Sequence, residues 1–313
     1  MNRPLLRAIQ LAVTVASFGL LWYLADGETA MRQLAEAHPA WIGAALVMLT
    51  LQTLLSALRW RLTAGQFGIT LAPGIAVREY YLSQIGNQLL PGGMLGDAGR
   101  ALRARDEAGL LASGQAVLFE RLAGQIALFA IFAAGVLGTS LVPGGFDGSA
   151  WLLPVTLLIT VGAGLALRIG GDGDSAAGHA RRTVHGFRVA FVHAVAAREI
   201  RTRQLALSLG TAACNVTAFA CCASAVDASL SAPAAMVTVP LILLSMLIPF
   251  TVSGWGLREG AAAALLPLAG GTGADGLAAS VAFGFTLLLA TTPGLIALAF
   301  VTAPDPANEQ LRS

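Results

Sequence analysis

Two hydrophobic segments of the chain repeat the same three residues at one spacing, and together these residues could bind an anion. The segments read LLPGGMLGDAGR (89–100) and LIPFTVSGWGLREG (247–260). The shared residues are Pro91, Gly96 and Arg100 in the first segment and Pro249, Gly254 and Arg258 in the second. Proline and glycine interrupt a helix, and a broken helix exposes N–H groups whose partial positive charge favours anions. An arginine beside each break therefore predicts a site for a phosphate.

Carboxylates accompany these arginines along the sequence. Asp97 lies three residues before Arg100, so the two can pair on one helix face. Glu120 and Arg121 lie one to two turns inside a long apolar run, where an ionised side chain costs roughly 3 kcal/mol unless it is paired or faces water. Together with Arg258 and its neighbour Glu259 these groups would form a nearly neutral network, in which a ligand anion displaces one carboxylate from an arginine. The alternative is a structural salt-bridge cluster, with the arginines reaching lipid headgroups.

The predicted substrate-binding residues combine the breaks with these charges. They are Asn87, Pro91, Gly92, Gly96, Asp97, Arg100, Glu120, Arg121, Gly254, Gly256, Arg258 and Glu259. Asn87 could donate to a headgroup or only satisfy the broken helix. No HExxH, GxSxG or GxxxxGK[ST] motif is present, so we expect no catalytic residue, cofactor or metal. Cys214, Cys221 and Cys222 share one helix face and are interpreted as small buried hydrophobes.

The composition determines what surrounds these residues. Of 313 residues, 56% are hydrophobic and 12% are charged, whereas a soluble protein has about 25% charged residues. Such a chain could not cover its surface in water, which excludes a soluble enzyme and a disordered protein. The net charge of +2 is too small to indicate a nucleic-acid partner.

The elements that position the charges are predicted to be membrane helices. A span needs about 20 mostly apolar residues. Six runs qualify: 8–25, 40–58, 114–141, 150–168, 204–226 and 277–302. Two further segments, 79–96 and 237–268, are broken by glycine and proline. Arginines flank 79–96 on both sides, and the positive-inside rule places both flanks in the cytoplasm.

The segment 79–96 should therefore be a re-entrant hairpin, and 237–268 is interpreted as a second one that enters from the opposite face. We predict an all-α, polytopic membrane protein with about six spanning helices, two opposed re-entrant hairpins and an inverted repeat. Residues 1–313 would form a single domain with a cytoplasmic N-terminus. The charges do not decide the side of the C-terminus.

Residues 169–203 are predicted to form a cytoplasmic loop with a basic amphipathic helix. Val184, Phe187, Phe191 and Val195 recur at helical spacing among arginines. Such a helix is typical of one that lies on an anionic membrane surface. The alternative is a helix that docks a partner protein.

Four motifs together resemble the lysylphosphatidylglycerol synthase transmembrane region, a family of flippase-like membrane proteins. They are the Arg59-Trp60 step, QIGNQLLPGGMLGDAGRALRARDEAG (84–109), the Glu120-Arg121 pair and SGWGLREG (253–260). The resemblance covers about residues 5–303. It implies a multi-pass protein of the bacterial inner membrane that handles lipids or lipid-linked intermediates. No soluble synthase domain follows in this sequence, so we expect no synthase activity.

The function expected from the residues and the resemblance is non-enzymatic translocation or binding of an anionic lipid. Its partners would be the membrane and an anionic phospholipid or polyprenyl-linked lipid. The alternative is a non-catalytic accessory subunit of a membrane glycosyltransferase or lipid-biosynthesis complex. An enzyme that uses Asp97 or Glu120 as a base is the least favoured, because no nucleophile or metal set accompanies them.

Overall fold

Helices are the regular secondary structure of the described part of the chain, which contains no strand. The structure, a computed structural model, describes residues 19–20, 22–89, 94–141, 176–247 and 254–302. Its helices are α2 (Gly27–Ala35), α3 (Pro39–Gly65), α4 (Pro73–Leu89), α5 (Leu95–Arg103), α6 (Arg105–Leu141), α8 (Ala176–Ala196), α9 (Arg201–Ala225), α10 (Ala232–Ser245), α11 (Leu257–Leu265), the 3-10 helix η1 (Leu266–Ala269), α12 (Gly273–Ala290) and α13 (Pro293–Thr302). This agrees with the predicted all-α class.

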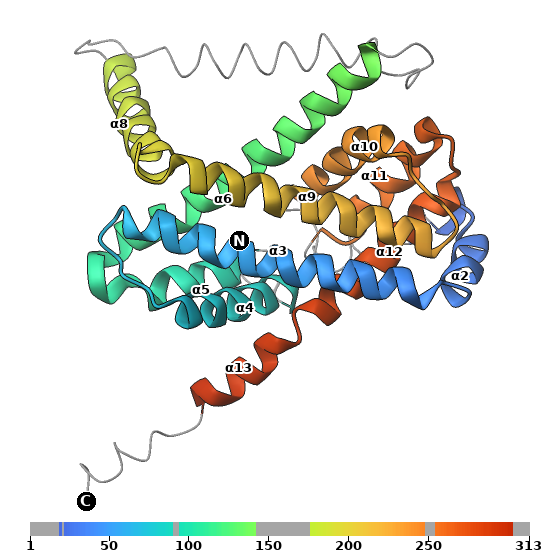
Figure 1. The fold of residues 1–313 in the computed structure, drawn as a ribbon, viewed down its shortest axis with the longest axis horizontal. Coiled ribbons are helices and arrows are strands. Elements are labelled where there is room, and N and C mark those ends of the chain that lie inside the picture. Colours follow the sequence, from blue (N-terminus) through green and yellow to red (C-terminus); the bar gives the residue numbers. More distant parts are fainter. Residues whose placement is uncertain (1–18, 21, 90–93, 142–175, 248–253, 303–313) are drawn as a thin grey trace, which may run out of the picture.

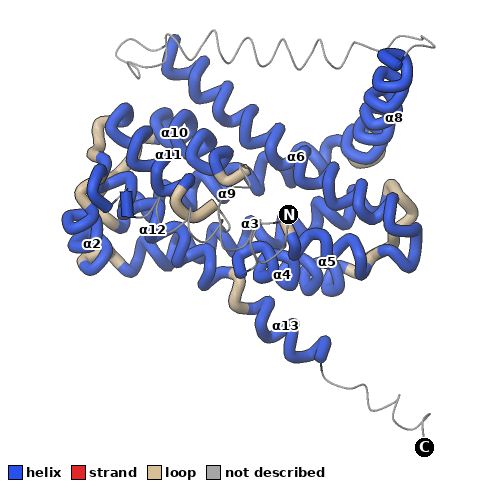
Figure 2. The backbone as a smooth tube through the Cα atoms, turned by 180° about the vertical axis from the view of Figure 1, so that it is seen from behind, coloured by secondary structure: helices blue, strands red, loops and turns tan. Residues whose placement is uncertain are grey.

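One pattern of elements occurs twice along the chain. A long helix, a helical hairpin and a second long helix follow one another as α3, α4–α5 and α6, and again as α9, α10–α11 and α12. Helices α3 and α9 run antiparallel side by side through the centre, and the two hairpins lie at opposite ends of this pair (Figures 1 and 2). The two halves also exchange contacts, because α6 packs on α10 and α13 packs on α4. This arrangement agrees with the predicted inverted repeat.

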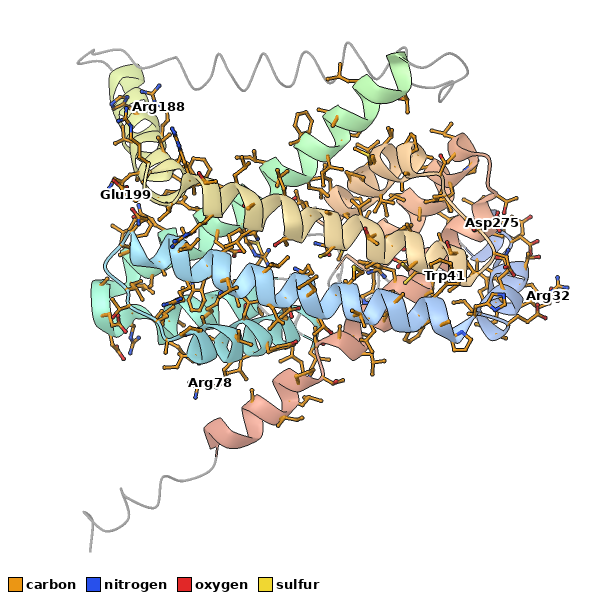
Figure 3. All side chains as sticks on the ribbon, viewed as in Figure 1. Arg32, Trp41, Arg78, Arg188, Glu199 and Asp275 are labelled. Atoms are coloured by element: carbon orange, nitrogen blue, oxygen red, sulfur yellow. The ribbon has the colours of Figure 1, made fainter. Side chains whose placement is uncertain are left out.

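Four helical segments are long and apolar enough to cross a membrane: Pro39–Gly65, Arg105–Thr139, Arg201–Ala225 and Gly273–Ala297. Arg32, Trp41 and Asp275 lie at one end of the central helices and Arg188 and Glu199 at the other (Figure 3). Charged and aromatic side chains at the ends of such helices are typical of membrane spans. The chain is therefore a multi-pass membrane protein.

Two of the six predicted spans fall largely or wholly outside the described residues, namely 8–25 and 150–168. The last predicted span, 277–302, corresponds to the candidate span Gly273–Ala297, but the helix is interrupted within it. Helix α12 ends at Ala290, and α13 begins at Pro293 after a two-residue turn. Pro293 explains the break, because proline has no N–H to continue the helix but fits its first turn.

Both broken segments form helical hairpins, as predicted. The first has α4 and α5 as its arms, which pack closely because glycines lie where they touch. A Cβ on Gly96 would overlap the carbonyl oxygen of Ser83, and one on Gly86 would lie 2.9 Å from the Cα of Gly96. The second has α10 and α11 as its arms, with Gly254 at φ 80° and Gly256 at φ 88° before α11. The predicted break residues Pro91 and Gly92 lie outside the described residues.

The predicted loop helix is present as α8, but its aromatic residues have a different role from the one expected. Phe187 and Phe191 meet the ring of Phe119 on α6 edge-on, with centroid distances of 5.0 and 5.4 Å. These two residues therefore attach α8 to the helix bundle. The apolar side chains of α8 that face outward include Val189 and Val192.

Candidate functional site: a polar cavity between the hairpins

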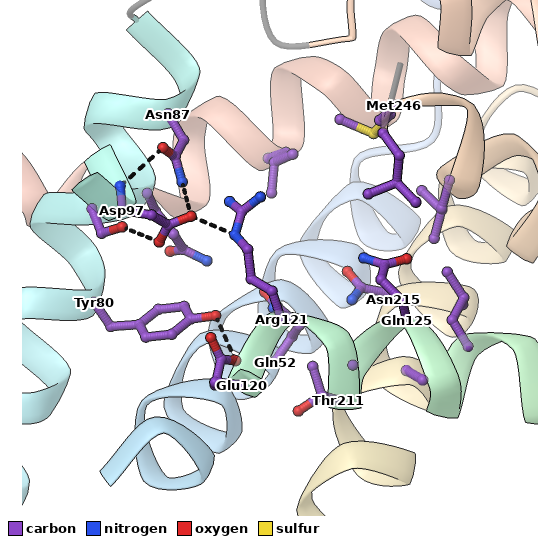
Figure 4. A pocket seen from close by; sticks show the side chains of 18 of the residues that line it. Gln52, Tyr80, Asn87, Asp97, Glu120, Arg121, Gln125, Thr211, Asn215 and Met246 are labelled. Carbon is purple, nitrogen blue, oxygen red and sulfur yellow. Dashed lines mark hydrogen bonds and ion pairs between the residues drawn. The ribbon is translucent and has the colours of Figure 1, made fainter. Parts of the chain in front are cut away.

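A cavity of about 280 Å³ lies where the two halves of the chain meet. The C-terminal ends of α4 and α10, which are the first arms of the two hairpins, both reach it. Helices α3, α6, α9 and α12, together with Asp97 of α5, complete its wall. The lining residues are Gln52, Arg59, Tyr80, Ser83, Gln84, Asn87, Gln88, Asp97, Glu120, Arg121, Gly124, Gln125, Leu128, Thr211, Ala212, Asn215, Leu243, Met246, Leu247, Phe283 and Leu287. Asn and Gln, which carry carboxamides, are the most numerous polar residues among them, and several are labelled in Figure 4.

Arg59 and Arg121 both line this cavity, and Arg121 is the more exposed of the two. Its side chain extends from α6 toward the first hairpin and forms an ion pair with Asp97 (Figure 4). It is 34% exposed, whereas Asp97 is 8% exposed. Glu120 and Arg121 are consecutive on α6 and point in different directions. The carboxylate is fully buried at the wall of the cavity, whereas the guanidinium is partly exposed in it.

Asp97 lies in the first turn of α5 and holds the two arms of the hairpin together. It accepts hydrogen bonds from the Ser83 hydroxyl at 2.7 Å, from the Asn87 amide at 3.1 Å and from Arg100 at 2.9 Å. Asn87 in turn accepts the backbone N–H of Asp97 at 3.3 Å. Asp97 therefore keeps several partners when Arg121 moves away from it.

Glu120 joins the same network from α6 and is fully buried. It accepts hydrogen bonds from Arg59 on α3, from Arg100 at 3.2 Å and from the Tyr80 hydroxyl at 3.3 Å. The guanidinium of Arg100 lies between the rings of Trp60 and Tyr80, at 4.6 and 4.5 Å from their centroids.

The charges of this first cluster do not cancel. Three arginines (Arg59, Arg100 and Arg121) face two carboxylates (Asp97 and Glu120), which leaves one positive charge with the side chains ionised. Unpaired charge at this depth is costly unless a counterion approaches it. Because Arg121 is the exposed member, an anion in the cavity would reach the cluster through it.

The second hairpin carries a neutral counterpart. Arg258 donates to Glu259 and to the Ser280 hydroxyl, with its Nε 3.0 Å from each acceptor. Its guanidinium lies 4.8 and 5.5 Å from the ring centroids of Trp255 and Phe283. Phe283 also lines the cavity, so this second cluster lies behind the cavity wall.

The structure brings four of the predicted site residues to the cavity and moves others away from it. Asn87, Asp97, Glu120 and Arg121 line it. The prediction that Arg100 and Arg258 bind the anion themselves is not supported, since they are 0% and 1% exposed and neither lines the cavity. The guanidinium of each is held between two aromatic rings and one or two carboxylates, so it points into the protein interior and away from the cavity. Gly96, Gly254, Gly256 and Glu259 also lie outside the lining, where they shape the hairpins.

Apart from Asn87, sequence reasoning missed the neutral polar residues of the cavity. Gln52, Gln125 and Asn215 come from three long helices, α3, α6 and α9. The sequence feature that could have identified them is a carboxamide within an apolar span, because a polar group at membrane depth faces protein or water. Within the described residues, no group of three His, Cys, Asp or Glu side chains could hold a metal ion.

Comparison with known protein families identifies a match for most of the chain. The family model described as "Lysylphosphatidylglycerol synthase TM region" matches residues 8–294, which include both hairpins and both charged clusters. A search of curated proteins finds no significant match.

Proposed function

We propose, from the premise that this chain belongs to the family of the lysylphosphatidylglycerol synthase TM region, that it is a non-enzymatic translocase of an anionic lipid. Membership and the apolar helices make it a multi-pass membrane protein linked to lipid metabolism. The proposal places it in a bacterial inner membrane with a cytoplasmic N-terminus. The ligand would be a phospholipid or a polyprenyl-linked lipid that carries a phosphate.

The observation that carries the proposal is the excess positive charge that Arg121 brings to the cavity. A phosphate would take the place of Asp97 at the Arg121 guanidinium, a geometry that arginine favours. Asp97 would keep its bonds to Arg100, Ser83 and Asn87. This exchange neutralises the cluster without leaving a carboxylate unpaired.

The remainder of the lining suits an amphipathic ligand. Arg121 and the carboxamides form its polar part, and Leu128, Leu243, Met246, Leu247 and Leu287 form an apolar part. The volume is near the lower end for small-molecule pockets, so it fits a headgroup rather than a whole lipid. The acyl or prenyl tails would remain in the bilayer.

Movement of the lipid across the membrane would depend on the two repeated halves of the chain. The first arms of both hairpins end at the cavity, one from each half of the chain. Rocking of one half against the other would open the cavity first to one leaflet and then to the other.

A second candidate function is that of a non-catalytic accessory subunit of a membrane glycosyltransferase or lipid-biosynthesis complex. The observation in its favour is the outward apolar face of α8, where Val189 and Val192 are 51% and 47% exposed. A partner protein or the membrane surface could cover this face.

Reconstitution of the purified protein in vesicles tests the translocase. Fluorescent phosphatidylglycerol would be followed by its accessibility to a membrane-impermeant quencher. We expect the wild type to move it and Arg121→Ala to slow it at least about tenfold, since one charge-assisted contact to the phosphate is lost.

Arg105→Ala is the matched control, because Arg105 is 57% exposed and pairs only with the exposed Asp106 among the described residues. Equal rates for Arg121→Ala and the wild type would contradict the proposed site. No movement by the wild type, together with co-purification of a transferase that is lost when Val189 and Val192 become polar, would favour the accessory subunit.

A further inference from the structure

The carboxylates at the cavity are already occupied by positive groups of the protein. Asp97 pairs with Arg100 and Arg121, and Glu120 pairs with Arg59 and Arg100. A headgroup with an ammonium group would need one of these carboxylates. Even where Asp97 accepted it in place of Arg121, the ammonium group would cancel the charge of the phosphate and leave the excess positive charge of the cluster in place.

The rest of the polar lining consists of neutral hydrogen-bonding groups. One of them is incomplete: the side-chain oxygen of Gln125 is buried and accepts no hydrogen bond from the described residues. Gln125 lies four residues after Arg121 on α6, so both face the cavity from one side of the helix. Asn215 and Thr211 of α9 line the same cavity (Figure 4).

A buried acceptor without a donor is costly, and a ligand that supplies an O–H would complete it. A phosphate at Arg121 would place the next atoms of a headgroup about one helical turn away, beside Gln125. The hydroxyls of that headgroup could then donate to Gln125 and exchange hydrogen bonds with the neighbouring carboxamide and hydroxyl.

We infer that the cavity selects a lipid whose phosphate carries an uncharged, hydroxyl-bearing headgroup, such as a glycerol or a sugar alcohol, over one that carries an ammonium group. Gln125 is the specificity-determining residue, and Arg121 binds the phosphate. The inference rests on the proposed function and names the substrate class of the same site.

The test compares labelled lipids that differ only in the headgroup, in vesicles and as stabilising ligands of the purified protein in detergent. The set contains phosphatidylglycerol, phosphatidylinositol, phosphatidylmethanol, phosphatidylethanolamine and lysyl-phosphatidylglycerol. Phosphatidylmethanol keeps the charge of phosphatidylglycerol but has no hydroxyl. The wild type is expected to bind and move the two hydroxyl-bearing anions about tenfold better than phosphatidylmethanol and the two amine-bearing lipids.

Variants of Gln125 then test whether this residue causes the headgroup preference. Gln125→Leu should abolish the advantage of phosphatidylglycerol over phosphatidylmethanol. Gln125→Glu should weaken binding of both anions, because the new carboxylate lies one turn from Arg121 and competes with the phosphate for it. Gln115→Glu, on the same helix but outside the cavity lining, should behave as the wild type. Comparison of the binding of phosphatidylglycerol with that of phosphatidylinositol shows whether the cavity prefers a glycerol or a cyclitol headgroup.

The outcomes separate this inference from the proposed function. Equal binding and movement of all five lipids by the wild type overturns the headgroup inference and leaves the translocase intact. Equal values for phosphatidylglycerol and phosphatidylmethanol overturn the role of the hydroxyls. Absence of movement with selective stabilisation by hydroxyl-bearing anions overturns translocation but supports the inference. Each comparison on the wild type stands even where a Gln125 variant does not fold.

Discussion

At the scale of single residues, three arginines share two carboxylates but have different roles: some stabilise the site, and one can contact a ligand. Arg100 is fully buried between two aromatic rings and bridges Asp97 and Glu120. Arg121 shares Asp97 yet remains partly exposed to the cavity. We therefore assign a structural role to Arg100, which stabilises the site, and a binding role to Arg121, which contacts the ligand.

This division predicts that substitutions of Arg100 and Arg121 destabilise the protein to different extents. Arg100→Ala should destabilise the fold by about 3–5 kcal/mol, because it removes a shared partner of two buried carboxylates. Arg121→Ala should cost about 1 kcal/mol or less, since Asp97 keeps Arg100, Ser83 and Asn87. Thermal unfolding of both variants in detergent measures the difference, and a wild-type midpoint for Arg100→Ala would refute the structural role.

The sequence predicted these residues as a set but not their separate roles. Asp97, Arg100, Glu120 and Arg121 could be found because charges are rare in apolar runs. Which arginine faces the cavity depends on how each helix is rotated, and for Arg100 that is set by the rings of α3 and α4. Spacing along one segment carries no information about such distant partners.

At the scale of elements, the two hairpins depend on glycine in different ways. Gly254 and Gly256 have positive φ values, which suit the sharp turn into α11. Gly96 instead lies within α5, where it lets the arms of the first hairpin touch. The sequence predicted both breaks from glycine and proline, but the close approach of α4 and α5 depends on the packing of two helices.

Gly96→Ala should therefore damage the first hairpin. Its Cβ would overlap the Ser83 carbonyl oxygen, and separation of the arms would disturb the Ser83 and Asn87 bonds to Asp97. We expect a loss of roughly 1–3 kcal/mol or more in unfolding free energy. Gly99→Ala is the control on the same helix, because its Cβ would meet only the end of the flexible Arg103 side chain, at 3.1 Å. Similar midpoints for the two variants would contradict this account of the hairpin.

At the scale of the whole molecule, the cavity belongs to both halves, and its transport role requires them to move. Asn87 from the first hairpin and Met246 at the end of α10 line opposite sides of it (Figure 4). In a background without the three native cysteines, Asn87→Cys with Met246→Cys and a short bifunctional thiol reagent would link the halves. We expect linking to abolish the lipid movement that the same double variant shows before the reagent is added.

The control pair for this experiment lies within one half. Thr70 and Glu107 are joined by a hydrogen bond of 2.7 Å from the Thr70 backbone N–H, and both are exposed. A link between cysteines at these positions crosses no boundary between the halves, so rocking of one half against the other should survive it. If linking Asn87→Cys to Met246→Cys leaves the rate unchanged, the two halves do not move against each other during transport. The cavity would then act as a fixed binding site, as an accessory subunit requires.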